Sequence, residues 1–459
     1  MKRFTALLLC LLLALSMTAC SGKPPEIQLP EPPEESKAQP PEEAGEREYI
    51  PLRDAEHVDP VFFEPDWTVD TTSLSFLQEL TDPTYQGRAT GSTGNRKAAD
   101  WIESQYIQWG IQPLPDLEGY RHSYPDQIFE IMPSHAAIVA PDGTESELEL
   151  GVDWVHIPSF EEIDLTLPLS ADPNDCAAGK AFLAGDTVDQ SLPYAYIEIE
   201  SGDVDEGVGY DNPKYSASRI TVTQEVYQEL TAEGAKLHLQ LPAAASDGMA
   251  DNVVGYLPGE DSTHAVLVSA HFDGSGQCGK LLPSAYDNGS GTAAMLQTAS
   301  WLSKAESLPC DVIFAAFNGE ENGKDGSSFF SSWIKTKYEQ IIVINIDCVG
   351  WAGEPMHVYA EEDQTGLANE LAGGLGIQYK PQYYNSDQAN FRAFNMAAVV
   401  ITQEICMEDD YVPEVMHSTN DVIDNLDPAA IDSLAKDLCA WVVERGGNTI
   451  AGTAYRVIW

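Results

Sequence analysis

The stretch V-L-V-S-A-H-F-D-G, residues 266–274, decides the fold class of this chain. It is a short, unbroken apolar run, as is typical of a strand buried on both faces of a parallel sheet. Runs of this kind cover residues 265–270, 312–317, 341–346 and 397–401, with helical patterns between them. The alternation predicts an α/β fold with an open, mainly parallel twisted sheet and helices on both faces.

Polar side chains with metal-binding chemistry follow three of these four predicted strands. In open α/β sheets, ligands bind beyond the carboxyl ends of the strands, so we expect these side chains at one edge of the sheet. Two loop motifs, S-A-Y-D-N-G-S-G (284–291) and M-H-S-T-N-D (416–421), add one residue each. The candidate residues are His271, Asp273, Asp287, Glu320, Glu321, Asp347 and His417.

The composition of this set favours zinc. Imidazole and carboxylate ligands without sulfur suit zinc or a similar first-row metal. Asp287, Glu321 and Asp347 supply three negative charges, and a bound hydroxide supplies a fourth, which together balance two divalent cations. A single ion would leave an excess of buried negative charge, which is costly, so we expect two zinc ions.

The remaining carboxylates fit supporting roles. Asp273 comes two residues after His271, where it can accept the other ring N–H and fix the orientation of the imidazole. Glu320 and Glu321 are adjacent and are not expected to bind the same metal. One of them can be a ligand while the other acts as a general base.

Each motif taken alone has an ordinary structural interpretation. An isolated H-x-D is a weak signal, an Asp before Asn-Gly is often a turn or a helix cap, and a Glu-Glu pair is usually solvated. Asp347 is a stronger signal, because an ionised carboxylate directly after an apolar run needs a partner. The order and spacing of the whole set carry the interpretation.

Composition excludes some partners. The chain has 459 residues, 24 Lys and Arg, and a formal net charge of −49. Nucleic acid is not expected as a partner, because phosphate binding requires clustered basic residues. None of the eight cysteines forms a C-x-x-C pair, which argues against a sulfur-ligated zinc site.

The first twenty residues have the zones of an export signal. Lys2 and Arg3 precede an apolar run, residues 6–15, that is too short to span a bilayer. The following M-T-A-C resembles the lipobox of bacterial lipoproteins, which implies cleavage before Cys20 and lipid attachment there. We therefore expect a signal peptide at 1–20 and an exported protein held outside the bacterial cell membrane only by a lipid at Cys20.

Composition also suggests the domain organisation. Residues 21–60 are rich in Pro and Glu and predict a disordered tether. Residues 124–245 show short alternating β-type runs that predict an inserted β-rich domain, whose end looks like that of a protease-associated domain. The catalytic domain is then expected at 61–123 and 246–459.

With these residues in place, the chain resembles the co-catalytic zinc aminopeptidases of metallopeptidase family 28, a group that includes glutamate carboxypeptidase II. The resemblance covers residues 86–113 and 252–444. The family pattern is present here as H-F-D, D-N-G-S-G, N-G-E-E-N-G, N-I-D and M-H-S-T.

The resemblance implies a role for each ligand. Asp287 would bridge two zinc ions, and the Asp287–Asn288 peptide bond would be cis, as is often found in the family. His271 and Asp347 would bind one ion, and Glu321 and His417 the other. Glu320 would be the general base. The implied function is that of a metal-dependent exopeptidase, an aminopeptidase that hydrolyses N-terminal residues from peptides.

Two alternatives use the same fold. One is a surface binding protein that has lost catalysis, and relatives of that kind usually lose ligands. The other is a single-zinc acyltransferase of the glutaminyl cyclase type, which would hold one ion per chain. A metal count on the purified protein separates all three.

Overall fold

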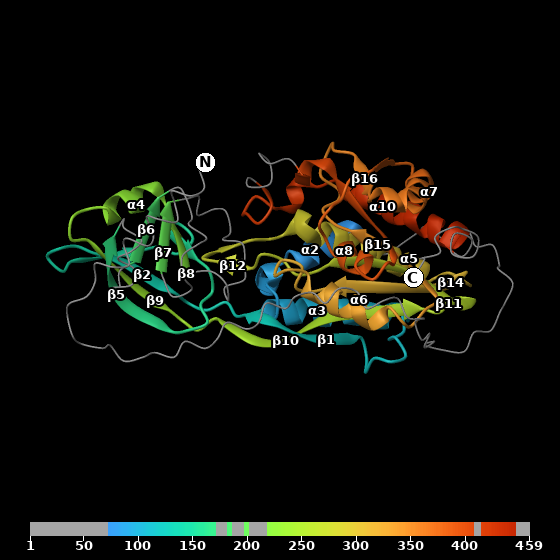
Figure 1. The fold of residues 1–459 in the computed structure, drawn as a ribbon, viewed down its shortest axis with the longest axis horizontal. Coiled ribbons are helices and arrows are strands. Elements are labelled where there is room, and N and C mark those ends of the chain that lie inside the picture. The colour runs from blue at the N-terminus through green and yellow to red at the C-terminus, as the bar shows by residue number, and fades with distance from the viewer. Residues whose placement is uncertain (1–71, 171–180, 186–196, 202–217, 408–414, 447–459) are drawn as a thin grey trace, which may run out of the picture. The chain divides into compact units, whose positions relative to one another are not determined.

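The computed structural model describes residues 72–170, 181–185, 197–201, 218–407 and 415–446. The predicted signal peptide, Cys20 and the predicted tether lie outside these ranges. Two sheets of eight strands each organise the described residues (Figure 1). None of the described helices is both long enough and apolar enough to cross a membrane.

The first sheet has the strand order β1-β10-β14-β11-β15-β18-β16-β17. The predicted runs form its centre, where β14, β11, β15 and β18 are parallel neighbours. Antiparallel pairs flank this centre, so the sheet is mixed. Its strands are β1 Arg121–Phe129, β10 Ala245–Leu257, β11 Asp261–His271, β14 Cys310–Phe317, β15 Gln340–Ile346, β16 Met356–Tyr359, β17 Gln378–Lys380 and β18 Ala397–Gln403.

The central strands bury both of their faces. Every residue of β14 is buried, and alternate residues pack into two different apolar clusters. Val312, Phe314 and Ala316 join the larger cluster, whereas Ile313 and Ala315 join the smaller one. A continuous apolar run in the sequence is the direct consequence of this two-sided burial.

Helices cover the two faces. The larger cluster receives side chains from α2 Ser73–Leu80, α3 Thr93–Trp109, α5 Gly291–Leu302, α7 Thr365–Leu375 and α10 Pro428–Trp441. The smaller cluster receives them from α6 Asp325–Ile334 and α8 Gln388–Arg392. The predicted α/β class, with helices on both faces of an open sheet, is confirmed.

Local signals set the ends of these helices. The Asp427 carboxylate accepts hydrogen bonds from the backbone N–H groups of Ala429 and Ala430, and Pro428 occupies the first turn of α10. Helix α3 ends at Gly110, which adopts the left-handed conformation that is common for glycine at helix C-termini.

The second sheet lies between β1 and β10 in the chain, with the order β3-β2-β9-β5-β6-β7-β8-β4. Its elements are β2 His135–Val139, β3 Glu145–Leu148, β4 Trp154–His156, β5 Ile163–Ser170, β6 Ala181–Gly185, β7 Ile197–Ser201, β8 Ser218–Val222, β9 Lys236–Leu241 and helix α4 Gln224–Leu230. Strand β1 crosses residue 124 and pairs with β10 throughout. The first sheet therefore includes residues 124–129, and the predicted domain limits remain a prediction.

Candidate metal centre

Three neighbouring parallel strands deliver most of the candidate residues to one edge of the first sheet. His271 is the last residue of β11 and lies opposite Phe317, the last residue of β14. Glu320 and Glu321 follow β14 after a short turn, and Asp347 follows β15 directly. The carboxyl edge of the sheet is where ligands bind in open α/β folds.

Asp287 reaches this edge from the turn Ala285–Ser290, which leads into α5. The Asn288 side chain donates to the carbonyl oxygen of Ile346 at 2.9 Å and accepts from the N–H of Cys348 at 3.2 Å. These bonds fasten the turn to the end of β15. The Asp287–Asn288 peptide bond is cis.

The side chains form two groups that share Asp287. Nε2 of His271 lies 3.2 Å from Oδ1 of Asp287 and 3.5 Å from Oδ1 of Asp347. Nε2 of His417 lies 3.2 Å from Oδ2 of Asp287 and 3.0 Å from Oε2 of Glu321. Each group gathers three donor atoms closely enough to hold a metal ion. Asp287 offers one oxygen to each.

Asp273 supports the first group from behind. Its Oδ1 faces Nδ1 of His271 at 3.5 Å, on the side of the ring away from Asp287. Its Oδ2 accepts from Oγ1 of Thr90 and from the N–H of Glu321, both at 3.2 Å. Asp273 thus orients a residue of each group, as carboxylates behind metal-binding histidines commonly do.

Glu320 belongs to neither group of ligands. Burial is the main cause that raises the pKa of its carboxyl group well above the ordinary value. The nearby positive charge of His271 lowers this pKa, whereas the negative charges of Asp387, Asp347 and Glu321 raise it. The charges of residues in both groups therefore act on the Glu320 carboxyl group.

Several buried atoms of the site make no hydrogen bond among the described residues. Nε2 of His271, Oδ1 of Asp347 and Oε1 of Glu321 have no hydrogen bond there. The nearby cation, the guanidinium of Arg88, is fully buried and donates to backbone carbonyl oxygens, including those of Phe272 at 2.7 Å and Ser284 at 2.8 Å. Three carboxylates, those of Asp287, Glu321 and Asp347, face two imidazoles here. Excess buried negative charge is costly, so this donor set fits divalent metal ions.

The two imidazoles are the positively charged partners of these carboxylates. Burial alone would lower the pKa of His271, but the contacts with Asp273, Asp287 and Asp347 outweigh burial and hold that pKa well above its ordinary value. The charge of Glu321 raises the pKa of His417 well above its ordinary value, against the effect of burial.

Two residues that position the site were not singled out from the sequence. Asp421 accepts from the N–H of Asp287 at 3.1 Å and from the N–H of Tyr286, and burial raises its pKa to about 7. Arg88 ties the loop around Ser284 to the end of β11 through its carbonyl contacts. Asp421 follows His417 in the quoted loop motif, but nothing in that motif indicates a backbone contact with Asp287.

The fold and the site define a class of protein. An open α/β sheet that gathers imidazoles and carboxylates without sulfur at its carboxyl edge is the arrangement of a metal-dependent hydrolase. Comparison of the sequence gives the family, since residues 252–442 match the family model of Peptidase family M28. This segment of the chain is an M28 peptidase domain.

Individual relatives agree with this assignment. The chain is 26% identical over 263 residues to a probable leucine aminopeptidase of Arthroderma benhamiae, which covers 52% of this chain and 71% of the relative. It is 32% identical over 108 residues to a probable lipoprotein aminopeptidase, LpqL, of Mycobacterium tuberculosis, which covers 24% of this chain and 21% of the relative.

A solved structure shares the fold. The zinc aminopeptidase of Bacillus subtilis aligns with 82% of this chain and 95% of its own, with a TM-score of 0.58 and 18% sequence identity.

Proposed function

We propose that this protein is an aminopeptidase that removes N-terminal residues from peptides with two zinc ions and Glu320 as general base. The observation that carries the proposal is the shared position of Asp287, whose two oxygens face two separate groups of ligands. The similarity to leucine aminopeptidases supports the choice of peptide substrates with a free amino end.

The residues divide the chemistry between them. When bound, zinc ions lower the pKa of a water molecule and polarise the scissile carbonyl group. Glu320 removes a proton from the attacking water and returns it to the leaving nitrogen as the peptide C–N bond breaks. The products are a free amino acid and a peptide shortened by one residue.

The other carboxylates keep this geometry. Asp273 holds the His271 ring in its orientation, and Asp421 holds the backbone of Asp287. The site is rich in buried acidic groups, and an N-terminal ammonium group would be attracted to them. This attraction is consistent with an exopeptidase that acts from the amino end.

The variant Glu320→Gln tests the assigned role. It should bind zinc as the wild type does while turnover falls by about 10²–10⁴-fold, since the amide cannot accept the proton. Glu339→Gln, at an exposed position away from the site, is the matched control and should keep wild-type turnover. Unchanged turnover in Glu320→Gln with full zinc content would refute the role of Glu320 as the base.

We also propose that the protein is exported and anchored outside the bacterial cell membrane through a lipid at Cys20. The similarity to a relative named as a lipoprotein aminopeptidase supports this proposal. Expression with a labelled fatty acid tests it. The wild type should carry the label in the membrane fraction and Cys20→Ser should not. Equal labelling of the two would contradict the anchor.

A further inference from the structure

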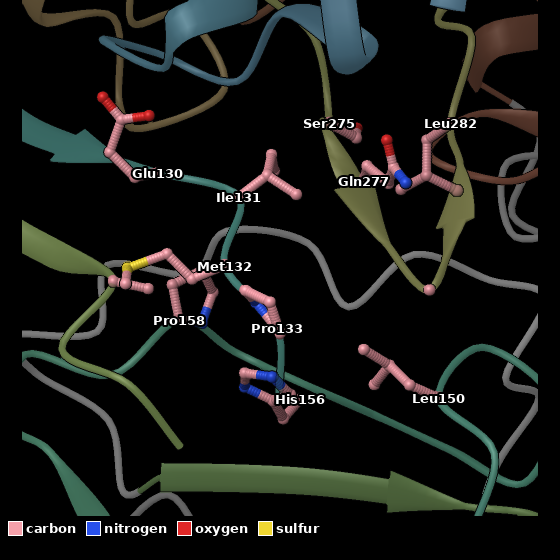
Figure 2. Close-up of a pocket in the computed structure, with 12 residues that line it drawn as sticks. Glu130, Ile131, Met132, Pro133, Leu150, His156, Pro158, Ser275, Gln277 and Leu282 are labelled. Atoms are coloured by element: carbon pink, nitrogen blue, oxygen red, sulfur yellow. The ribbon is translucent and has the colours of Figure 1, made fainter. Parts of the chain in front are cut away.

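A cavity of about 300 Å³ lies beside the loop that joins Asp273 to Asp287. Figure 2 shows side chains that approach it from three segments: the connection after β1, the second sheet, and the hairpin of β12 Gln277–Cys278 and β13 Lys280–Leu281. Most of the lining is apolar. It includes Ile131, Met132, Pro133, Leu150, Pro158 and Leu282.

The two titratable groups in the cavity wall, His156 and Glu130, already have partners. Nδ1 of His156 contacts the carbonyl oxygen of Ile157, and its Nε2 contacts Oγ of Ser134, both at 2.8 Å. Glu130 is paired with Arg96 at 2.5 Å and accepts hydrogen bonds from Thr93. The wall therefore offers apolar surface rather than a free charge, and an apolar group is the ligand that it fits.

Two segments of the cavity wall lead to Asp273, which contacts His271. Ser275, in the wall, comes two residues after Asp273, a distance of at most about 7 Å along the chain. The second segment begins at Phe129, the residue before Glu130. The N–H of Phe129 donates to the carbonyl oxygen of Thr90 at 3.1 Å. Oγ1 of Thr90 in turn donates to Asp273. The cavity is thus next to the residues that hold His271.

The hairpin wall is held in place by close backbone packing. Gly279, at the tip between β12 and β13, has φ +70°, and a Cβ atom there would lie 2.3 Å from the carbonyl oxygen of Leu150. Only glycine allows this approach. Leu150, which precedes the strands β4 and β5 of the second sheet, therefore supports the hairpin wall of the cavity, and Ser275 in the same wall lies two residues after Asp273.

We propose that this cavity binds an apolar side chain of the peptide substrate on the leaving side of the scissile bond. The inference rests on the aminopeptidase function proposed above. An extended peptide advances about 3.3 Å per residue, so two or three residues cover a length similar to the chain distance from Asp273 to Ser275 in the cavity wall. Met132 is 44% exposed, and its flexible thioether can adapt to side chains of different shape.

The test compares peptides that differ in one residue. The zinc-loaded protein is assayed with Leu-Gly-Gly-Gly and with the same peptide carrying Phe at the second, third or fourth position. Leucine p-nitroanilide, which has no residue to place in the cavity, is assayed alongside. We expect Phe at one of these positions to raise kcat/KM about tenfold over Gly, the size of a typical apolar subsite effect.

Variants of Met132 then connect the preference to the cavity. Met132→Trp should fill the space and reduce the ratio of kcat/KM for the Phe peptide to kcat/KM for the Gly peptide to about one. Met249→Trp is the matched control, since Met249 is 59% exposed on β10 outside the cavity, and it should keep the wild-type ratio. Met132→Glu should shift the preference from Phe to Lys at the same position, which a misfolded variant could not do.

The outcomes separate the two proposals. Hydrolysis of leucine p-nitroanilide with no gain from Phe at any position, or with a gain that Met132→Trp leaves intact, overturns the cavity proposal and leaves the aminopeptidase assignment standing. No hydrolysis of any of these substrates by the zinc-loaded protein overturns both.

Discussion

The two halves of the metal centre differ in their access to water. In the His271 half, the imidazole side chain is 1% exposed and the Asp347 side chain 6%. In the other half the Glu321 side chain is 8% exposed, but the His417 side chain is 37% exposed. One half is enclosed by protein, whereas the other opens to solvent through its histidine.

The difference follows from where each histidine lies in the chain. His271 ends β11, which is paired on both sides by β14 and β15, and Asp273 faces its second ring nitrogen. His417 lies in a loop at φ +59°, a backbone conformation that residues other than glycine adopt less often. An ion in the first half would be held rigidly, whereas an ion in the second half would be reached by solvent.

The largest expected contrast is in the stability of the metal-free protein. His271→Ala should lower the free energy of unfolding by about 3–5 kcal/mol, because it leaves buried carboxylates without their cationic partner. His417→Ala should lower it by about 1 kcal/mol, because water reaches that histidine and screens its neighbours. Urea unfolding in the presence of a chelator measures both values. An equal decrease in the free energy of unfolding for the two variants would contradict the difference between the two halves.

Metal release should follow the same order. A chelator added to the zinc-loaded protein should empty the His417 half first, with affinities that differ by about 10–100-fold, the range over which supporting contacts change metal binding. Zinc release followed with a colorimetric indicator should show two phases of equal size. His417→Ala should lose the fast phase. A single phase in the wild type would argue against two unequal halves.

A smaller effect is expected from Asp273→Asn. The amide is a weaker acceptor for the His271 ring, so zinc affinity at the enclosed half should fall by about tenfold and the two release phases should move closer together. Asp261→Asn is the matched control, because Asp261 pairs with His264 on the same strand at 2.5 Å but away from the site. If both variants release zinc alike, Asp273 has no special role.

Burial on both faces made the central strands predictable from the sequence. The runs at 265–270, 312–317, 341–346 and 397–401 all lie within strands, because a strand covered on both sides has no polar positions to interrupt it. The parallel order of these strands then placed the residues that follow them at one edge.

The two antiparallel strands β1 and β10 of the first sheet were harder to predict. Strand β10, A-S-D-G-M-A-D-N-V-V-G-Y-L, begins with polar residues and glycine, and its first half is partly exposed. It pairs with β1, and all strands of the second sheet lie between these two strands in the sequence. Local pattern contains no signal for a strand whose partner lies more than a hundred residues away.

The roles of Arg88 and Asp421 could not be predicted from the sequence, because both act through contacts with distant backbone groups. Arg88 contacts the carbonyl oxygen of Phe272, 184 residues away, and Asp421 contacts the N–H of Asp287, 134 residues away. Both act on backbone groups, which look the same at every position of a sequence. The assignment of Asp287 as the shared residue likewise came from the family resemblance, and the spacing of the motifs alone did not give it.

The most direct test of two ions sharing Asp287 is a crystal structure of the zinc-loaded protein with anomalous diffraction collected at the zinc edge. Two zinc peaks are expected, one on either side of the Asp287 carboxylate. One should be bound by His271 and Asp347, and the other by Glu321 and His417. A single peak, or peaks that Asp287 does not contact, would contradict this arrangement.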